Sequence, residues 1–247
     1  MKEFEMIFGK RAIIEAIQIG KKIDKILICK GLQSKLSHEL FNIIKETDIL
    51  IRRVPREKLD RLTRRNHQGL VAFISTITYQ KLESIVPFLY EEGKVPLILL
   101  LDGITDVHNF GAIARSCECA GVNAIVIPLV NSVSVNADAI KISAGALMSL
   151  SVCRESNIMN AVKFLKLCGY KVYAATEKAT TLYTKTDYTY PTAIVIGSED
   201  KGISPAVLYL CDKLVKIPTL GNITSLNVSA ATAVLLYEVL RQRTTCS

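Results

Sequence analysis

Three polar loops in the second half of the chain carry residue types suited to binding an anion and handling a hydroxyl group. They cover residues 101–121, 194–204 and 217–238, and each follows an apolar run with the length of a strand. Their candidate chemical side chains are Asn109 and Arg115, then Glu199, then Ser225 and Asn227. Amides and hydroxyls donate and accept hydrogen bonds, and helix starts offer free backbone N–H groups to anions. We expect the three loops to build one site.

The glycine-rich loop at 197–202 excludes two common kinds of nucleotide enzyme. Gly197 and Gly202 have the spacing of a phosphate-binding loop, but Ile203 stands where that loop requires lysine. No GxGxxG pattern follows any expected strand. An ATPase or an ordinary dinucleotide enzyme is therefore disfavoured.

The cysteines and the histidines predict no metal site. Seven cysteines form no CxxC pair, and no His, Cys or carboxylate cluster has ligand spacing. An odd number of scattered cysteines predicts free thiols in a reducing compartment. The apolar run 95–101 is too short to cross a bilayer, and the start MKEFEMIFGKR lacks the pattern of an export signal. We expect a cytoplasmic protein with no membrane contact.

The elements that must position the loops divide the chain in two. Apolar runs at 95–102, 123–127, 171–175, 192–197 and 213–218 predict strands, and the segments between them predict helices. This alternation predicts an α/β fold with a mostly parallel sheet covered on both faces. In such sheets ligands bind beyond the carboxyl ends of the strands, where the three loops lie. Residues 95–247 are expected to form this domain.

A smaller α/β domain is expected over residues 1–75. Helices are predicted at 9–20, at 35–47 and from residue 55, with strands at 24–29, 48–54 and 69–75. Residues 76–94 are expected to link the domains and to carry one short helix.

Positive charge is concentrated in the smaller domain. The chain has a net charge of +8, and residues 1–75 hold 16 Lys and Arg against 9 Asp and Glu. Such a bias indicates a polyanionic partner, and nucleic acid is favoured over a merely solvated surface. The candidate RNA contacts are Arg52, Arg53, Arg64, Arg65 and His67. The alternative for His67 is that it caps the strand that follows.

The three loops together resemble a known family. "NFGAIAR" (109–115), "IGSEDKGIS" (196–204) and "IPTLGNITSLNVSAATAVLLYE" (217–238) are similar to the three motifs of the SpoU (TrmH) branch of the SPOUT RNA methyltransferases. The N-terminal block, from "IFGKRAIIEAI" to "NHQGLVAF", resembles the substrate-binding domain of the family members that methylate guanosine 2'-oxygens in 23S rRNA. The resemblance thus extends over both domains.

The resemblance implies a cofactor and a knot. It implies a deep trefoil knot in the C-terminal domain and S-adenosylmethionine as methyl donor. The cofactor would be held by Thr176, Gly197, Ile217 and Leu226. The helix at 227–243 is apolar on more than one face, which indicates burial against a second subunit and so predicts a homodimer formed through the C-terminal domain.

The resemblance assigns catalysis to Asn109, Arg115, Glu199, Ser225 and Asn227. Arg115 would either activate the ribose hydroxyl or clamp a neighbouring phosphate while water takes the proton, because a guanidinium is a poor base. The asparagines would orient Arg115 and the ribose, Glu199 would fix Arg115 or the loop, and Ser225 would contact the target group.

Plainer interpretations stay open. Either asparagine could be a helix cap, Glu199 a turn residue and Ser225 a partner of local backbone. The expected function is 2'-O-methylation of a ribose in 23S rRNA. The alternatives are a tRNA methyltransferase of the same family, or a non-catalytic RNA-binding or ribosome-assembly protein on the same fold.

Overall fold

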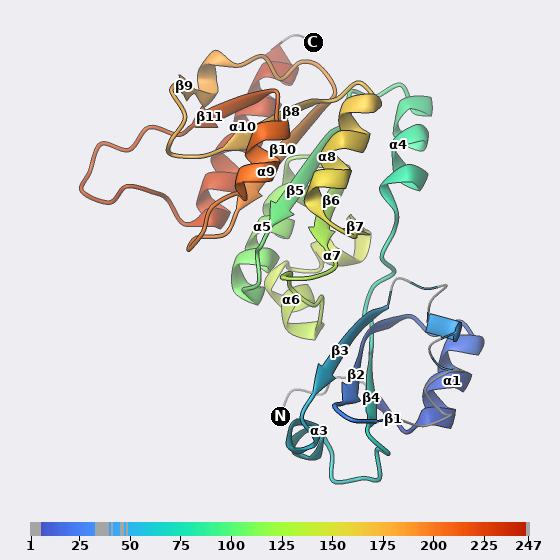
Figure 1. The fold of residues 1–247 in the computed structure, drawn as a ribbon. Coiled ribbons are helices and arrows are strands. Elements are labelled where there is room, and N and C mark those ends of the chain that lie inside the picture. The colour runs from blue at the N-terminus through green and yellow to red at the C-terminus, as the bar shows by residue number, and fades with distance from the viewer. Residues whose placement is uncertain (1–5, 33–39, 41, 45–46, 48, 246–247) are drawn as a thin grey trace. The chain divides into compact units, whose positions relative to one another are not determined.

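The computed structural model describes residues 6–32, 40, 42–44, 47 and 49–245 of the chain. The chain forms two compact units, Met1–Thr78 and Tyr79–Ser247, called unit 1 and unit 2 below. Figure 1 shows both units as ribbons.

Unit 1 is a four-stranded sheet with helices on both faces. Its elements are β1 (Met6–Phe8), α1 (Lys10–Gln18), β2 (Ile23–Cys29), β3 (Leu50–Val54), α3 (Arg56–Leu62) and β4 (Leu70–Ile74). The strand order is β1-β4-β2-β3, with β2 and β3 parallel and the other pairs antiparallel. The expected small α/β unit is present, and β1 is an additional strand. Most of the helix expected at 35–47 lies outside the described residues.

Each face of the unit 1 sheet has its own hydrophobic core. On one face Ile26, Ile28 and Ala72 pack against α1 through Ile13 and Ile14. On the other face Leu27, Val71 and Phe73 pack against Leu59 of α3. The alternation of residues along β2 and β4 produces this division, since successive side chains of a strand point to opposite faces.

Unit 2 is built on a seven-stranded sheet. The strands are β5 (Leu97–Asp102), β6 (Ala124–Pro128), β7 (Ser151–Glu155), β8 (Lys171–Ala175), β9 (Thr181–Leu182), β10 (Thr192–Gly197) and β11 (Lys213–Lys216). The helices are α4 (Leu82–Glu91), α5 (Val107–Cys119), α6 (Ala137–Ile142), α7 (Ala146–Ser149), α8 (Ile158–Leu167), α9 (Pro205–Leu210) and α10 (Val228–Thr245), with the 3-10 turn η1 at Tyr183–Lys185.

Every strand pair in this sheet is parallel, which confirms the expected fold class. The order is β7-β6-β5-β10-β8-β11-β9. The five expected strands are all present, and β7 and β9 add one strand at each edge. Because all strands run the same way, β5, β10 and β11 deliver the three polar loops to the same end of the sheet.

Helices cover both faces of the sheet (Figure 1). One core joins Ile98, Leu100 and Val195 of the sheet to α4, α8 and α9. On the other face α10 packs along α5, and α6 packs closely on α5 because residue 111 is glycine. A Cβ at Gly111 would lie 2.7 Å from the Cβ of Ile142. The trefoil knot stays a prediction.

The segment 76–94 contacts the sheet of unit 2 through Gln80, near the start of the segment, as well as through α4. Gln80 forms a parallel bridge with Cys153, next to the edge strand β7. Its backbone N–H donates to the carbonyl of Val152 at 2.9 Å, and the N–H of Arg154 donates to its carbonyl at 3.2 Å. The Tyr79 ring lies 3.5 Å from the Arg154 guanidinium carbon. Only residues 76–78 lie between this attachment and Ser75 of unit 1, whose N–H donates to the carbonyl of Lys22.

No helix in the described ranges is long and apolar enough to cross a membrane.

Candidate active site

The first polar loop ends at Asp106, which caps α5, so the side chain of Asn109 is available for other contacts. The carboxylate of Asp106 accepts a hydrogen bond from the backbone N–H of Asn109 at 2.8 Å and so caps the helix. Asn109 therefore lies in the first turn of α5 and is not the cap. Its side-chain Nδ2 instead donates to Glu199 Oε1 at 3.3 Å.

The second loop is a tight turn that places Glu199 at the end of β10. Gly202 N–H donates to the carbonyl of Ser198 at 2.8 Å, and Lys201 N–H donates to Ser198 Oγ at 3.2 Å. A Cβ on Gly197 would overlap the backbone of Gly202, so only glycine allows the turn to close. Asp102 at the end of β5 accepts from Ser204 N–H at 2.8 Å and ties the turn to its neighbouring strand.

The third loop reaches the same point through Asn227. The Oδ1 atom of Asn227 accepts from the backbone N–H of Ser229 at 2.9 Å and thereby caps α10. Its Nδ2 donates to Glu199 Oε1 at 2.6 Å and to Asn109 Oδ1 at 3.0 Å. Asn227 thus serves both as a helix cap and as a link between the loops.

These contacts unite the three loops at one oxygen atom. Glu199 Oε1 accepts from Asn109, from Asn227 and, at 3.3 Å, from the backbone N–H of Val228. The carboxylate also lies at the start of α10, where the helix dipole favours negative charge. We call Asn109, Glu199 and Asn227 the amide–carboxylate cluster. It is fixed by hydrogen bonds at the end of the sheet, where Glu199 and Asn227 are exposed and Asn109 is half-buried.

Arg115 and Ser225 are not joined to this cluster. Arg115 is exposed on α5, and Ser225 is exposed in the third loop. Within the described residues neither side chain has a hydrogen bond or an ion pair. Glu199 therefore fixes the two asparagines and the start of α10, and Arg115 remains accessible to a ligand.

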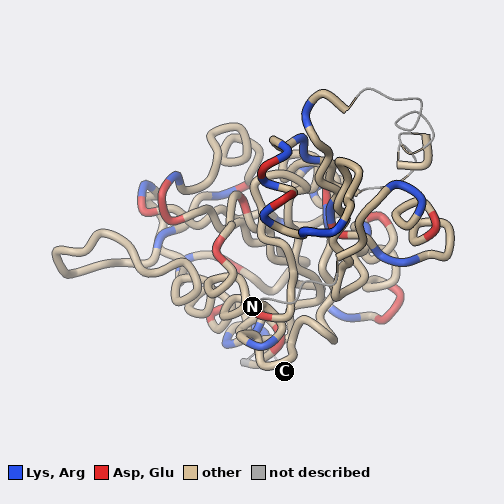
Figure 2. The backbone as a smooth tube through the Cα atoms, turned by 90° about the horizontal axis from the view of Figure 1, so that it is seen from below, with Lys and Arg blue, Asp and Glu red and all other residues tan. Residues whose placement is uncertain are grey.

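The segment between β11 and α10 has the features of a cofactor-binding loop. It extends away from the sheet in Figure 1, and Figure 2 shows it at the left without charged residues. Over 219–226 the described contacts are limited to one hydrogen bond, from Thr219 Oγ1 to the carbonyl of Thr224. Leu226 is 44% exposed, and Ile223 is 80% exposed. Unpaired peptide groups and exposed aliphatic side chains fit an adenine ring, whose edge needs hydrogen bonds and whose faces need apolar contact.

The other candidate cofactor residues flank this loop. Thr176 follows β8, and its backbone N–H donates to the carbonyl of Val215 in β11 at 2.9 Å. Ile217 follows β11 directly, and Gly197 ends β10. All these positions lie at the carboxyl ends of adjacent strands, as expected for one pocket.

The candidate RNA residues of unit 1 divide by exposure. The arginines at 52, 53, 64 and 65 are all exposed. His67 is buried, with only 4% exposed. Its Nδ1 accepts from Gly69 N–H at 3.0 Å and its Nε2 contacts Asp60 at 2.8 Å. In this structure His67 supports the turn before β4, as the capping alternative describes.

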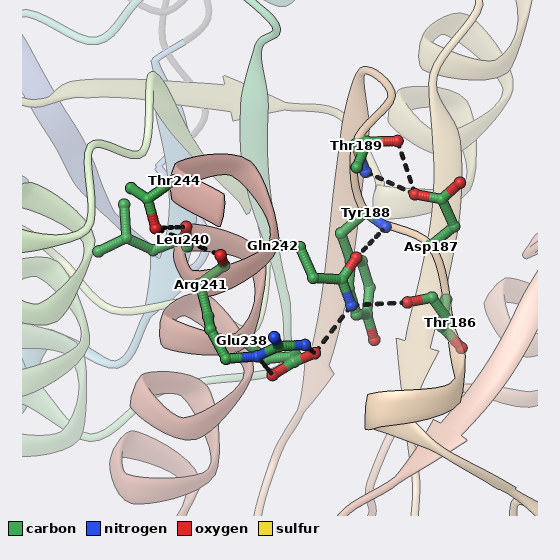
Figure 3. Close-up of polar contacts among 9 residues, drawn as sticks. All are labelled: Thr186, Asp187, Tyr188, Thr189, Glu238, Leu240, Arg241, Gln242 and Thr244. Atoms are coloured by element: carbon green, nitrogen blue, oxygen red, sulfur yellow. Dashed lines mark hydrogen bonds and ion pairs between the residues drawn. The ribbon is translucent and has the colours of Figure 1, made fainter. Parts of the chain in front are cut away.

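The far end of α10 is held by buried polar contacts that the sequence did not indicate (Figure 3). The side chain of Gln242 donates to the carbonyl of Thr186 and accepts from the N–H of Tyr188, both at 2.9 Å. It also donates to Glu238 at 2.8 Å, and Arg241 binds both oxygens of that carboxylate. Hydrogen bonding to Arg241 lowers the pKa of Glu238 below its ordinary value, although burial acts in the opposite direction.

Arg243 adds to this attachment through backbone carbonyl groups. Its guanidinium donates to four carbonyl oxygens, those of Val95, Pro96, Tyr188 and Tyr190, at 2.7 to 3.4 Å. Burial lowers the pKa of Arg243. The two ends of α10 thus differ: one carries exposed polar groups at the loops, and the other is fixed to the body of unit 2.

The cysteines and acidic residues give no sign of a metal centre. The six cysteines within the described part of the chain are free thiols. Burial raises the pKa of Cys153 to about 12, so this thiol stays protonated. Among the same residues no group of three His, Cys, Asp or Glu side chains could hold a metal ion.

Comparison with known proteins gives this fold and site a class. The SpoU rRNA Methylase family profile matches residues 96–237, and the profile for RNA 2'-O ribose methyltransferase substrate binding matches residues 6–80. A relative in Staphylococcus saprophyticus, assigned to the TrmH family of tRNA/rRNA methyltransferases, is 35% identical over 96% of both chains. YacO of Bacillus subtilis, of the same description, is 33% identical over 98% of this chain and 97% of its own.

Solved structures agree with these sequence relatives. The SpoU methyltransferase AviRb from Streptomyces viridochromogenes, crystallised with the cofactor AdoMet, matches with a TM-score of 0.61 and 26% identity. That match covers 97% of this chain and 90% of AviRb. The fold and the loops therefore define an RNA methyltransferase that uses S-adenosylmethionine. The chain belongs to the SpoU (TrmH) family.

Proposed function

We propose that the protein methylates the 2'-oxygen of a guanosine ribose in 23S rRNA. The observation that carries this proposal is the meeting of all three loops at Glu199 Oε1, beside the uncharged loop 219–226. The match of unit 1 to a domain that binds substrate for RNA 2'-O ribose methylation supports the choice of atom. The concentration of positive charge in unit 1 supports a large RNA as substrate.

The division of labour follows from what ribose methylation requires. Bound S-adenosylmethionine supplies a methyl group on a sulfonium, so the leaving group is already good and no metal is needed. The protein must hold the 2'-oxygen in line and help it lose a proton. Asn109 and Asn227, both held by Glu199, would orient the ribose, and Ser225 would contact the target hydroxyl or its phosphate. Thr176, Gly197, Ile217 and Leu226 would hold the cofactor.

Arg115 keeps two roles in this proposal. It would either take the hydroxyl proton or clamp the adjacent phosphate while water takes that proton. Arg115 is exposed and has no partner among the described residues, so its guanidinium is available to contact bound RNA. A guanidinium stays protonated in nearly all proteins, which favours the clamp.

The proposal includes a homodimer in the cytoplasm, formed through unit 2, and the trefoil knot of the family. Support for a second subunit comes from exposed apolar side chains on and before α10. Tyr237 is 52% exposed, and Leu220 is fully exposed in the loop. Large exposed apolar groups of this kind are often covered by a partner. Sedimentation equilibrium would test the dimer, and a monomer at micromolar concentration would contradict it.

The test of the target is a map of 2'-O-methyl sites in rRNA and tRNA from cells with and without the gene. Loss of one 23S guanosine site, restored by the wild-type gene and not by Arg115→Ala, is the expected result. Loss of a tRNA site instead would favour the tRNA alternative, and an unchanged map would favour a non-catalytic RNA-binding role.

A further inference from the structure

The edge strand of unit 1 presents two neighbouring arginines to opposite faces of the sheet. Arg52 pairs in register with Leu27, which pairs with Val71, which pairs with Phe8. Residues paired in this way project to the same face. Arg53 pairs with Ile28 and so belongs to the other face. Both arginines are exposed, and neither side chain has a hydrogen bond or an ion pair with the described residues.

The face that carries Arg52 also carries two other cations beside aromatic rings. The guanidinium of Arg65 lies 5.5 Å from the centre of the Phe8 ring, and Lys25 Nζ lies 4.9 Å from the centre of the Phe73 ring. Lys25 and Phe73 are themselves paired in register, on the row next to Arg52. We call Lys25, Arg52 and Arg65, with Phe8, the basic sheet face.

The two faces differ in how completely helices cover them. The Arg53 face is packed with aliphatic side chains from α1 and from Leu40 and Ile44. The basic sheet face is covered by α3, a helix of seven residues and therefore about 10 Å long. A sheet of four strands spaced about 4.8 Å apart is wider than this helix is long. Phe8, on the edge strand β1, is half-buried, as are the other two residues of that strand.

The charged residues of α3 add positive charge to the basic sheet face. The exposed cations of this helix are Arg56, Lys58 and Arg61, and its acidic residues are Glu57 and Asp60. Asp60 already contacts His67 at 2.8 Å. The basic sheet face therefore combines several cations with an accessible aromatic edge, a combination that suits phosphates and unstacked bases of single-stranded RNA.

We propose that unit 1 binds its RNA on the basic sheet face, with Arg52 and Arg65 contacting phosphates, and that Arg53 takes no part. This inference rests on the proposed function for the nature of the ligand, and it selects one face of the sheet. It divides the arginines at 52, 53, 64 and 65, which the sequence alone grouped together.

The test compares two double variants of the full-length protein that remove the same charge. Arg52→Gln with Arg65→Gln changes the basic sheet face. Arg11→Gln with Arg53→Gln is the matched control, because Arg11 lies exposed on α1, which packs on the opposite face. Binding to a 23S rRNA fragment and to bulk tRNA is measured as a function of salt for each protein. Circular dichroism and thermal melting verify that both variants fold like the wild type.

The expected result is a difference in salt dependence between the two variants. Each single-strand phosphate contact contributes about 0.7 to the log–log slope, so the first variant should lose about 1.4 and the control none. The RNA concentration at half-maximal rate should rise for the first variant, while the rate at saturating RNA stays near that of the wild type. Equal losses in both variants, or a loss only in the control, would overturn the assignment of the face.

The failure of the proposed function has a separate signature. If the wild type binds tRNA and ignores the 23S fragment, the target is wrong, and the two variants still decide the face from their tRNA slopes. Binding of neither RNA by the wild type would overturn both proposals.

Discussion

Unit 1 and unit 2 use polar side chains in opposite ways. In unit 2 one oxygen of Glu199 accepts three hydrogen bonds, from the two asparagines of the amide–carboxylate cluster and from the backbone N–H of Val228. In unit 1 the side chains of Arg52 and Arg53 are exposed on an edge strand and have no hydrogen bond or ion pair with the described residues. Group transfer requires a fixed geometry, whereas holding phosphates requires charge that adapts to a flexible polymer. Changes in unit 2 should therefore reduce the rate, and changes in unit 1 should reduce RNA affinity.

The largest effect is expected from Arg115, which lies in unit 2 and yet is exposed, with no side-chain hydrogen bond or ion pair to the described residues. Arg115→Ala should lower the methylation rate by about 10²- to 10⁴-fold, because it removes the group proposed to act on the hydroxyl or its phosphate. Affinity for S-adenosylmethionine, measured by calorimetry, should stay within about twofold. Arg115→Lys should also be poor, since a point charge does not replace the planar fork. A Lys variant with most of the activity would contradict both proposed roles.

Removal of unit 1 tests whether RNA affinity depends on that unit. A protein of residues 79–247 retains all three loops and the whole seven-stranded sheet, so it should fold and bind S-adenosylmethionine. Its affinity for a 23S rRNA fragment should fall by on the order of 10²-fold, because most of the excess positive charge is gone. A filter-binding titration checks this. If the shortened protein selects its RNA as well as the full chain, unit 1 has another task.

Glu199 offers a sharper test within unit 2, because its neighbour is a natural control. Glu199→Ala leaves the donors of Asn109, Asn227 and Val228 without their common acceptor, and the rate should fall about ten- to a hundredfold. Asp200 is exposed beside it without a described partner, so Asp200→Ala should have almost no effect. Single-turnover kinetics at saturating RNA measures both. Equal rates for the two variants would mean that the cluster does not orient the reactants.

The smallest expected effect is that of a chelator. The described residues hold no group of three metal-binding side chains, and methyl transfer from a sulfonium needs no Lewis acid. Binding of S-adenosylmethionine and turnover should be unchanged by EDTA after allowance for ionic strength. A loss that added Mg²⁺ or Zn²⁺ restores would show a metal requirement in one of the two units.

The strength of local patterns decided how much of the fold the sequence could predict. β5 and β10 were evident because "LILLLD" and "TAIVIG" are nearly continuous apolar runs, typical of strands buried on both faces. β7 was missed because its sequence, SVCRE, ends in an arginine and a glutamate that are both buried. β9 has two residues, too few for any pattern.

The start of α5 offers two residues that are good helix caps, Asp106 and Asn109, and the structure uses Asp106. The sequence left open that Asn109 is a helix cap, whereas Asp106 caps α5 three residues earlier. Asp is as good a cap as Asn, and the spacing in "DVHN" was a usable signal. The role of His67 was not decidable in this way, because its contacts with Asp60 and Gly69 depend on how the turn before β4 folds.

Arg243 has a consequence for the order in which the chain can fold. Its guanidinium contacts the carbonyl of Val95, 148 residues earlier in the sequence. At about 5 to 20 residues per second a ribosome needs roughly 7 to 30 s to make that stretch. Unit 1 ends at Thr78 and can fold while the rest is still being synthesised. Unit 2 must wait for its last helix, so during translation its strands stay exposed to aggregation and to chaperones far longer than those of unit 1.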